Sequence, residues 1–180
     1  MKQSSLKSAS CSQRPKLVTS SAKLRPVIIL RLRRALQRDF AQARRWFLLA
    51  AAQGCASSMY NLGLMYEVGR GGERDLDKAA GWYRAAALRG ESKAMLNLGI
   101  KNLLDQFAAA EPTVGIAWLR RASRRGDVHA MYNLAIAHER GAGCRKSEVI
   151  ALRHYRKAAA AGSTKALERL QELDAATRTP

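Results

Sequence analysis

The chain has 180 residues, of which 47% are hydrophobic and 6% aromatic, and its 32 Lys and Arg against 14 Asp and Glu give a formal net charge of +18. This length accommodates one compact domain or one short repeat array. No apolar stretch of the sequence approaches the ~18 residues of a membrane span, and three cysteines at unrelated spacings argue against a disulfide framework and favour a reducing, cytoplasmic location.

The excess positive charge is concentrated near the N-terminus. Residues 1–38 contain ten Lys or Arg and no Asp or Glu. Residues 1–25 are rich in Ser and Lys and are predicted to form a disordered basic tail, although a targeting segment of mitochondrial style has the same composition. Residues 26–38 are expected to form a degenerate capping helix or an extension of the first helix of the array that follows. At the other end, residues 175–180 are expected to be disordered.

Between these segments the sequence repeats every 36 residues. The phrase "MYNLGLMYEVGRG" at residues 59–71 returns as "MYNLAIAHERGAG" at residues 131–143, two periods later. Other positions recur at the same spacing without a gap, among them Trp46, Trp82, Trp118 and His154; Phe47, Tyr83, Leu119 and Tyr155; Gly54, Gly90, Gly126 and Gly162; and Leu62, Leu98, Leu134 and Leu170. A fixed period of this length indicates a repeat array, which we place at residues 39–174.

Each repeat contains two helical patterns, A and B. In the first complete copy, helix A is predicted at about residues 57–68, followed by a Gly-Arg-Gly stop, and helix B at about residues 76–89, followed by Gly90. A last helix at about residues 164–173 would cap the array. The predicted N-cap positions of the B helices are in register and comprise Asp39, Asp75, Glu111 (before Pro112) and Ser147.

The second copy departs from this pattern. Leu103, Asp105 and Phe107 stand where the first copy has Glu67, Gly69 and Gly71. Because the glycine stop is missing, helix A of this copy is predicted to run on for about one more turn and to end before Pro112. The apolar cluster of Leu103, Leu104 and Phe107 would then either contact a partner or pack locally on the next helix pair.

Helices of about 12 to 14 residues are marginally stable alone in water, so these units must stack on one another. The predicted fold is therefore all-α, a right-handed α-solenoid of stacked antiparallel helix pairs with a 36-residue repeat. Alanines allow neighbouring helices to approach closely, and aromatic side chains such as Trp82 are expected to be buried between the pairs.

The recurring unit closely resembles the Sel-one-like repeat, a relative of the tetratricopeptide repeat. The resemblance is carried by Ala94, Leu98 and Gly99 in helix A, by the Gly-x-Gly stop, and by the pattern A-x-x-W-Y-x-x-A-A-x-x-G that begins at Ala79. It covers about residues 39–173. The resemblance implies a non-catalytic adaptor or scaffold, without a cofactor, that binds a peptide or a protein partner.

By the same resemblance, the A helices would line a concave binding face. The residues expected to bind a partner there are Tyr60, Asn61, Leu64, Lys93, Leu96, Asn97, Ile100, Leu103, His129, Tyr132, Asn133, Ile136 and Lys165. The asparagines form a row, one in each repeat. Their amides could grip the backbone of an extended peptide, or each could bond to an adjacent helix or loop and help to set the stacking.

Basic side chains also recur in register on the B helices. The predicted basic stripe comprises Arg84, Arg120, Arg121, Arg124, Arg125, Arg156 and Lys157. The stripe is either an ordinary solvated face or, together with the basic tail, a contact for nucleic acid or an anionic membrane surface. An exported effector is a further alternative, because residues 1–25 could act in targeting.

Candidate catalytic and metal-binding residues are few. His138 and His154 take the register positions of Tyr66 and Trp46, and both are interpreted as substitutes for buried aromatic rings. Cys144 follows His138 by six residues, so a Cys–His pair is conceivable, but no orienting partner is evident. No zinc-binding spacing is present. The sequence therefore predicts a protein that is not an enzyme.

Overall fold

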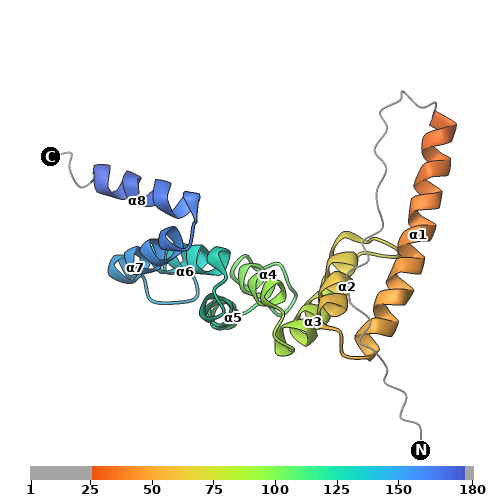
Figure 1. Ribbon diagram of the computed structural model, residues 1–180, viewed down its shortest axis with the longest axis horizontal. Coiled ribbons are helices and arrows are strands. Elements are labelled where there is room, and N and C mark those ends of the chain that lie inside the picture. Colours follow the sequence, from red (N-terminus) through yellow and green to blue (C-terminus); the bar gives the residue numbers. More distant parts are fainter. Residues whose placement is uncertain (1–25, 177–180) are drawn as a thin grey trace, which may run out of the picture.

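The chain folds into helices that follow one another in short hairpins (Figure 1). The computed structural model describes the backbone of residues 26–176 and the side chains of residues 39–175. The predicted tail at 1–25 and residues 177–180 of the tail predicted at 175–180 lie outside the described residues, whereas Ala175 and Ala176 belong to the last helix, contrary to the prediction. The eight helices of the described part are α1 (Pro26–Ala52), α2 (Ala56–Val68), α3 (Leu76–Leu88), α4 (Ser92–Leu103), α5 (Pro112–Arg124), α6 (Val128–Arg140), α7 (Glu148–Ala160) and α8 (Thr164–Ala176).

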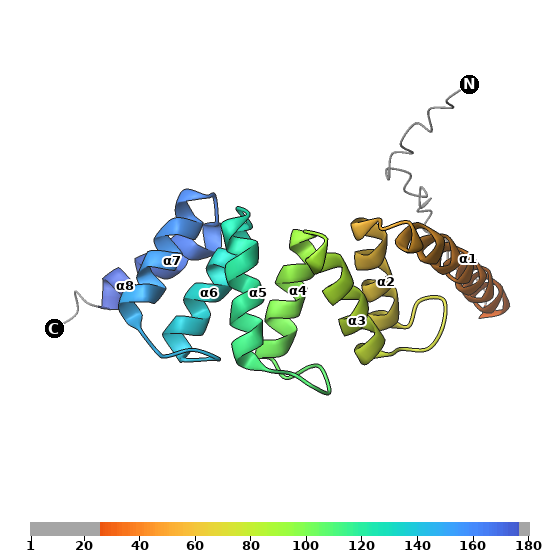
Figure 2. The same cartoon turned by 90° about the horizontal axis from the view of Figure 1, so that it is seen from below.

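The helices stack in sequence order. Each helix packs mainly on the helices before and after it, with a smaller contact between α4 and α6, and Figure 2 shows the same order across the molecule. In Figure 1 the row forms a shallow arc, with α2, α4 and α6 along its inner side and α3, α5 and α7 along its outer side. The predicted α-solenoid of antiparallel helix pairs is thus confirmed. No helix of the described part is long and apolar enough to cross a membrane.

The predicted caps are present at two of the four positions. Asp75 accepts a hydrogen bond from the backbone N–H of Lys78 at 2.8 Å, and Ser147 accepts one from that of Ile150 at 3.4 Å. Glu111 stands at the N-cap of α5 without a side-chain cap bond, and Pro112 begins that helix. The prediction for Asp39 is wrong, because α1 runs unbroken from Pro26 to Ala52. Residues 26–38 therefore extend the first array helix, the second of the two arrangements predicted for them.

The prediction that α4 runs on past its missing glycine stop is also wrong. The helix ends at Leu103, and Asp105 takes the left-handed conformation with φ of 53°. In register, Gly69 and Gly141 end α2 and α6 with φ of 72° and 77°. Aspartate is among the few non-glycine residues that tolerate this region. The left-handed conformation that ends the helix is therefore retained in α4, although aspartate replaces the glycine.

This substitution predicts a stability effect. Asp105→Gly should raise the free energy of unfolding by roughly 0.5–1 kcal/mol, because glycine adopts a positive φ without the steric cost that a Cβ atom carries. Chemical denaturation followed by circular dichroism would measure the change. Asp105→Val, which cannot adopt this conformation cheaply, should lower stability. Equal stability of all three proteins would contradict the assignment.

The core lies between the paired helices. It consists of the register leucines 62, 98 and 134, of Tyr83, Leu119 and Tyr155, and of many alanines, all nearly inaccessible. The expectation that the tryptophans are the buried aromatics needs correction. Tyr83 is 0% exposed, whereas Trp82 is only partly buried and Trp46 is 71% exposed. The reason is that the tyrosine ring fits against Gly63, where a Cβ atom would come within 2.5 Å of it.

The apolar cluster predicted at Leu103, Leu104 and Phe107 is only partly buried. Phe107 is 7% exposed and belongs to the main core, while Leu103 packs partly against that core. Leu104 is 59% exposed. Buried Asn102 ties the segment down, because its side-chain oxygen accepts a hydrogen bond from the backbone N–H of Glu111 at 2.9 Å. Local packing therefore accounts for Phe107. Leu104 is the exposed member of the predicted cluster.

Candidate functional site

Two polar clusters lie on the inner helices and link successive repeats. In the first, the Glu67 carboxylate on α2 accepts a hydrogen bond from the Tyr83 hydroxyl at 2.6 Å and pairs with the Lys101 ammonium of α4 at 2.7 Å. The Tyr60 ring lies 5.8 Å from that of Tyr83 in a tilted arrangement. The side chain of Asn97 on α4 lies close to both tyrosine hydroxyl groups. The carboxylate of α2 therefore binds side chains from two further helices, α3 and α4.

The second cluster repeats this arrangement two periods later. Glu139 of α6 accepts a hydrogen bond from the Tyr155 hydroxyl of α7 and forms an ion pair with Arg169 of α8. The rings of Tyr132 and Tyr155 are 5.7 Å apart. Arg169 also pairs with Glu172 at 2.7 Å. Each cluster thus consists of two tyrosines, a glutamate and a cation, and the cation comes from the following repeat.

These contacts shift the titration of their members. The hydrogen bond from Arg169 holds the pKa of Glu139 below its ordinary value. Burial, followed by the hydrogen bond to the neighbouring glutamate, raises the pKa of Tyr83 and that of Tyr155. Glu139 is therefore charged and Tyr83 and Tyr155 are neutral at physiological pH.

The repeat between the two clusters is apolar at the same register positions. Leu96, Leu103 and Leu119 stand where the flanking repeats have tyrosine, glutamate and tyrosine. Leu96, Ile100 and Leu103 are partly buried against the core, as are Leu64 and, in the second core, Tyr132 and Ile136. Along the arc, the inner helices therefore present the first polar cluster, then an apolar step formed by Leu96, Ile100 and Leu103, then the second polar cluster.

The remaining predicted contact residues are distributed as follows. Lys93, His129 and Lys165 are exposed, and Asn61, Asn97 and Asn133 are partly buried. The Asn133 amide donates a hydrogen bond to the His129 carbonyl of its own helix at 2.8 Å. Asn133 therefore bonds within its own helix, whereas Asn97 lies close to the tyrosines of the preceding repeat.

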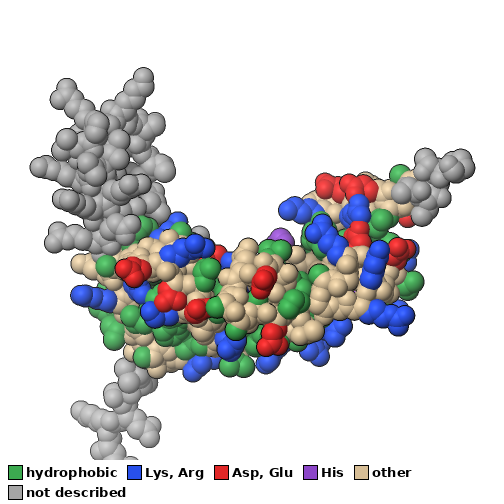
Figure 3. Space-filling view, turned by 180° about the vertical axis from the view of Figure 1, so that it is seen from behind, with side chains coloured by type: hydrophobic (Ala, Val, Ile, Leu, Met, Phe, Trp, Pro, Cys, Tyr) green, Lys and Arg blue, Asp and Glu red, His purple; other side chains and the backbone are tan. Residues whose placement is uncertain are grey.

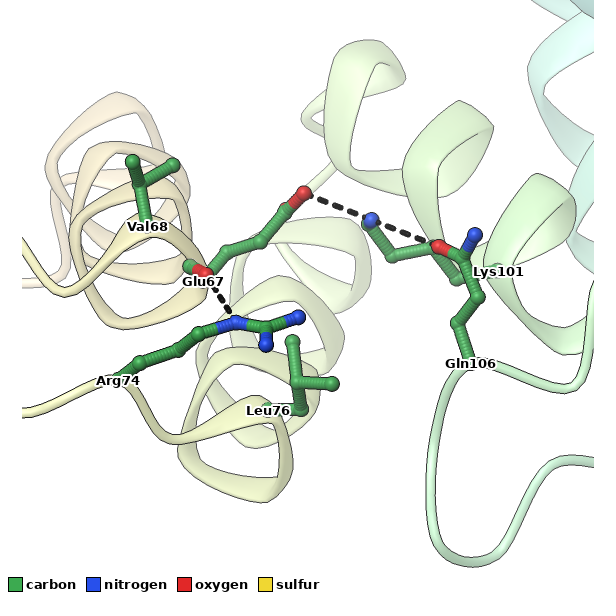
Figure 4. A pocket seen from close by; sticks show the side chains of 6 residues that line it. All are labelled: Glu67, Val68, Arg74, Leu76, Lys101 and Gln106. Carbon is green, nitrogen blue, oxygen red and sulfur yellow. Dashed lines mark hydrogen bonds and ion pairs between the residues drawn. The ribbon is translucent and has the colours of Figure 1, made fainter.

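Beside the first cluster lies a hollow of about 440 Å³ (Figure 4). It is lined by Glu67, Val68, Arg74, Leu76, Lys101 and Gln106. Figure 4 shows the Lys101 side chain between Glu67 and Gln106, to which it donates a hydrogen bond at 3.2 Å. The Arg74 guanidinium donates to the Glu67 backbone carbonyl at 3.1 Å. The hollow thus has charges of both signs, held by internal partners.

Sequence reasoning missed Lys101 as a member of the first cluster. A signal was available: Lys101 stands in register with Met65 and Ala137, so a charge replaces an apolar side chain at one repeat only. Likewise, Arg169 occupies the register position at which the three preceding repeats have asparagine. In both places, a charged residue that departs from the pattern of its repeat position pairs with a glutamate of the preceding repeat.

The predicted basic stripe is exposed throughout, but its members have different neighbours. Arg120, Arg124 and Lys157 line a groove together with His138 and His154. Outside this groove, the Arg125 guanidinium donates to the Ser92 hydroxyl at 3.2 Å, and that of Arg121 lies 5.7 Å from the Trp118 ring. Lys and Arg outnumber Asp and Glu along the lower edge of the face in Figure 3.

His138 and His154, which line this groove, lie together, and Cys144 contacts His138. The Cys144 sulfur is 3.4 Å from Nδ1 of His138, which is 4% exposed as expected of an aromatic substitute. The His138 and His154 rings stack with centroids 5.7 Å apart. Burial raises the pKa of the Cys144 thiol, which is opposite to the shift that activates a nucleophile. Within residues 39–175, no group of His, Cys, Asp or Glu could hold a metal ion.

Comparisons with known proteins agree with this architecture. The model of the Sel1 repeat matches residues 33–55, 56–91, 92–127 and 128–163. A Sel1 repeat protein from Oxalobacter formigenes is 27% identical, with a TM-score of 0.71 over 77% of this chain and 56% of its own. A protective antigen of uropathogenic Escherichia coli strains, which displays an SLR fold, is also 27% identical, with a TM-score of 0.69 over 76% of this chain and 29% of its own.

This chain therefore spans little more than half of the first structure and less than a third of the second. No curated protein sequence matches it. The family model covers more than half of the chain, and its repeat boundaries coincide with the hairpins α2–α3, α4–α5 and α6–α7. The chain belongs to the Sel1 repeat family.

Proposed function

We propose that this protein is a non-catalytic scaffold whose inner helices bind a peptide segment of a partner protein. Sel1 repeat proteins are generally protein-interaction scaffolds. The observation that supports a specific surface here is the succession of the two polar clusters with the leucine-lined step between them. Partly exposed leucine and isoleucine can receive apolar side chains, while the flanking clusters offer fixed donors and acceptors to a peptide backbone.

The arrangement is suited to binding because it is rigid before the partner arrives. The tyrosines are held by ring contacts and by hydrogen bonds to glutamate, and each glutamate is fixed by a cation of the next repeat. Side chains that are already ordered lose little conformational entropy on binding. In this proposal, the apolar step provides most of the affinity for the peptide, and the two polar clusters orient the peptide.

A paired-variant experiment tests this surface. Peptides selected from a random library on the full chain would be measured by fluorescence polarisation against Leu96→Gln/Ile100→Gln on α4. Loss of two apolar contacts should weaken binding by roughly tenfold or more. The matched control is Arg84→Gln/Leu88→Gln, which has the same one-turn spacing on the outer helix α3.

The control should bind as tightly as the unchanged protein. If the selected peptides keep their affinity for the α4 variant and lose it for the α3 variant, partner binding lies on the outer face. Thermal melting of both variants by circular dichroism would show that each remains folded, because Leu96 and Ile100 are only partly buried.

A further inference from the structure

A groove of about 560 Å³ is lined by residues of α5, α6 and α7. Figure 2 shows these three helices next to one another in sequence order. The groove lining includes the basic residues Arg120, Arg124 and Lys157, and the imidazoles of His138 and His154. No carboxylate lines it among the described residues. The walls of the groove are therefore positively charged on both sides.

The positive charge of the groove is not neutralised by the described part of the chain. The ion pairs there involve Lys78, Lys101 and Arg169, and none reaches Arg120, Arg124 or Lys157. All three are exposed. Arg120 and Arg124 are one helical turn apart on α5, so their guanidinium groups project from the same side of the helix. Lys157 approaches from the other wall on α7.

His154 lies in this positive environment with an unsatisfied atom. Its Nδ1 is buried and has no hydrogen-bond partner among the described residues. Burial lowers the pKa of His154, and His138, Lys157, Arg120 and Arg153 lower it further. The neighbours that act on this ring are thus cationic side chains and one other imidazole. An anion bound in the groove would oppose them and raise the pKa of His154.

We propose that this groove binds an acidic peptide segment of a partner protein, with its carboxylates on Arg120, Arg124 and Lys157. Guanidinium groups bind carboxylates through paired hydrogen bonds, and this charge complementarity identifies the occupant. Ala117 is exposed and Ile150 partly exposed, and both add an apolar portion to the lining, which suits a peptide that carries aliphatic side chains between its acidic ones. The lining includes residues of α6 but none of the residues of the surface proposed on the inner helices, so the two sites can be tested independently.

A labelled Glu-rich peptide is the probe, and a Gln-rich peptide of the same length is its neutral counterpart. At near-physiological salt the full chain should bind the first and not the second. The groove variant Arg120→Gln/Arg124→Gln/Lys157→Gln should lose at least roughly tenfold in affinity for the Glu-rich peptide. The matched control is Arg84→Gln/Arg121→Gln/Arg156→Gln, which removes the same charge outside the groove and should lose less than about threefold.

Equal losses in the groove variant and the control would overturn the proposal, because binding would then follow net charge alone. It would also be overturned if a single-stranded oligonucleotide of matched charge bound more tightly than the Glu-rich peptide and depended on the same three residues. All six substituted side chains are exposed, and a melting curve for each variant would verify folding.

Histidine titration by NMR gives a local readout of where the peptide lies. The chain has three histidines, and the exposed His129 lies outside the groove lining. Bound carboxylates should move the pKa of His154 upward and leave that of His129 unchanged. If the peptide bound while the His154 pKa stayed constant, the site would lie elsewhere and the proposal would be wrong.

Discussion

Replacing Tyr83 with alanine is expected to lower the free energy of unfolding by about 3–5 kcal/mol, the usual cost of truncating a buried aromatic side chain. Tyr83 is completely inaccessible, and its ring fills the space that Gly63 leaves open between α2 and α3. Its hydroxyl also donates to Glu67, which pairs with Lys101 of the next repeat. The truncation would therefore empty a cavity within one repeat and loosen the link to the following one. Urea denaturation followed by circular dichroism would measure the loss.

Two companion variants separate the causes. Trp82→Ala, at the neighbouring and partly exposed position, should cost only about 1–2 kcal/mol, because less apolar surface is lost from the core. Tyr83→Phe keeps the ring and removes the hydrogen bond to Glu67, which should cost about 1 kcal/mol. Equal losses for Trp82→Ala and Tyr83→Ala would show that the assignment of the buried aromatic is wrong.

Gly115→Leu is expected to lower the free energy of unfolding by about 3 kcal/mol, the upper end of the usual cost of overpacking. A Cβ atom at Gly115 would lie 2.8 Å from the backbone carbonyl oxygen of Gly99. That contact is with backbone on the facing helix, so no side-chain rotation can relieve it, and α4 and α5 would have to move apart. The other two complete repeats have alanine in this register, at Ala79 and Ala151, so glycine at this contact is specific to the α4–α5 pair.

Gly81→Leu is the matched control, because Gly81 lies in α3 and a Cβ atom added there would have no neighbour within 4 Å among the described residues. This change should leave stability the same or raise it by roughly 0.5–1 kcal/mol, since leucine has the higher helix propensity. Thermal unfolding of both variants in parallel would test the pair. Similar behaviour of the two would mean that the helices of the second hairpin are not in close contact.

The two proposed binding surfaces differ in whether their residues recur in another repeat. The tyrosines and the glutamate of the polar clusters recur two periods apart, and a cation of the following repeat completes each cluster, so the second supports the interpretation of the first. The basic groove has no such counterpart, because it depends on Arg124, His138 and His154, which stand in register with Leu88, Asn102 and Trp118 of the preceding repeat. A partner that uses both surfaces would contact the inner helices and the outer helices α5 and α7 at once, and such bivalent attachment increases affinity.

The sequence by itself determined the repeat, the helices and their order. A period of 36 residues without gaps fixes which residue of each repeat occupies which position, and the N-caps Asp75 and Ser147 and the glycine stops are local signals that act within one helical turn. The inner-face candidates followed from this register together with the resemblance to tetratricopeptide arrays. Local propensity and periodicity thus sufficed for the architecture.

Only the tertiary structure decided which of two adjacent aromatics is buried, that Asp105 would take the conformation of the missing glycine, and that Lys101 and Arg169 would reach the glutamates of the preceding repeats. It also brought Arg120, Arg124 and Lys157 to one groove while leaving the rest of the basic stripe outside it. The physical reason is that burial and ion pairing depend on distances between helices. These distances follow from the packing of particular side chains, such as a tyrosine ring against a glycine, and periodicity does not encode them.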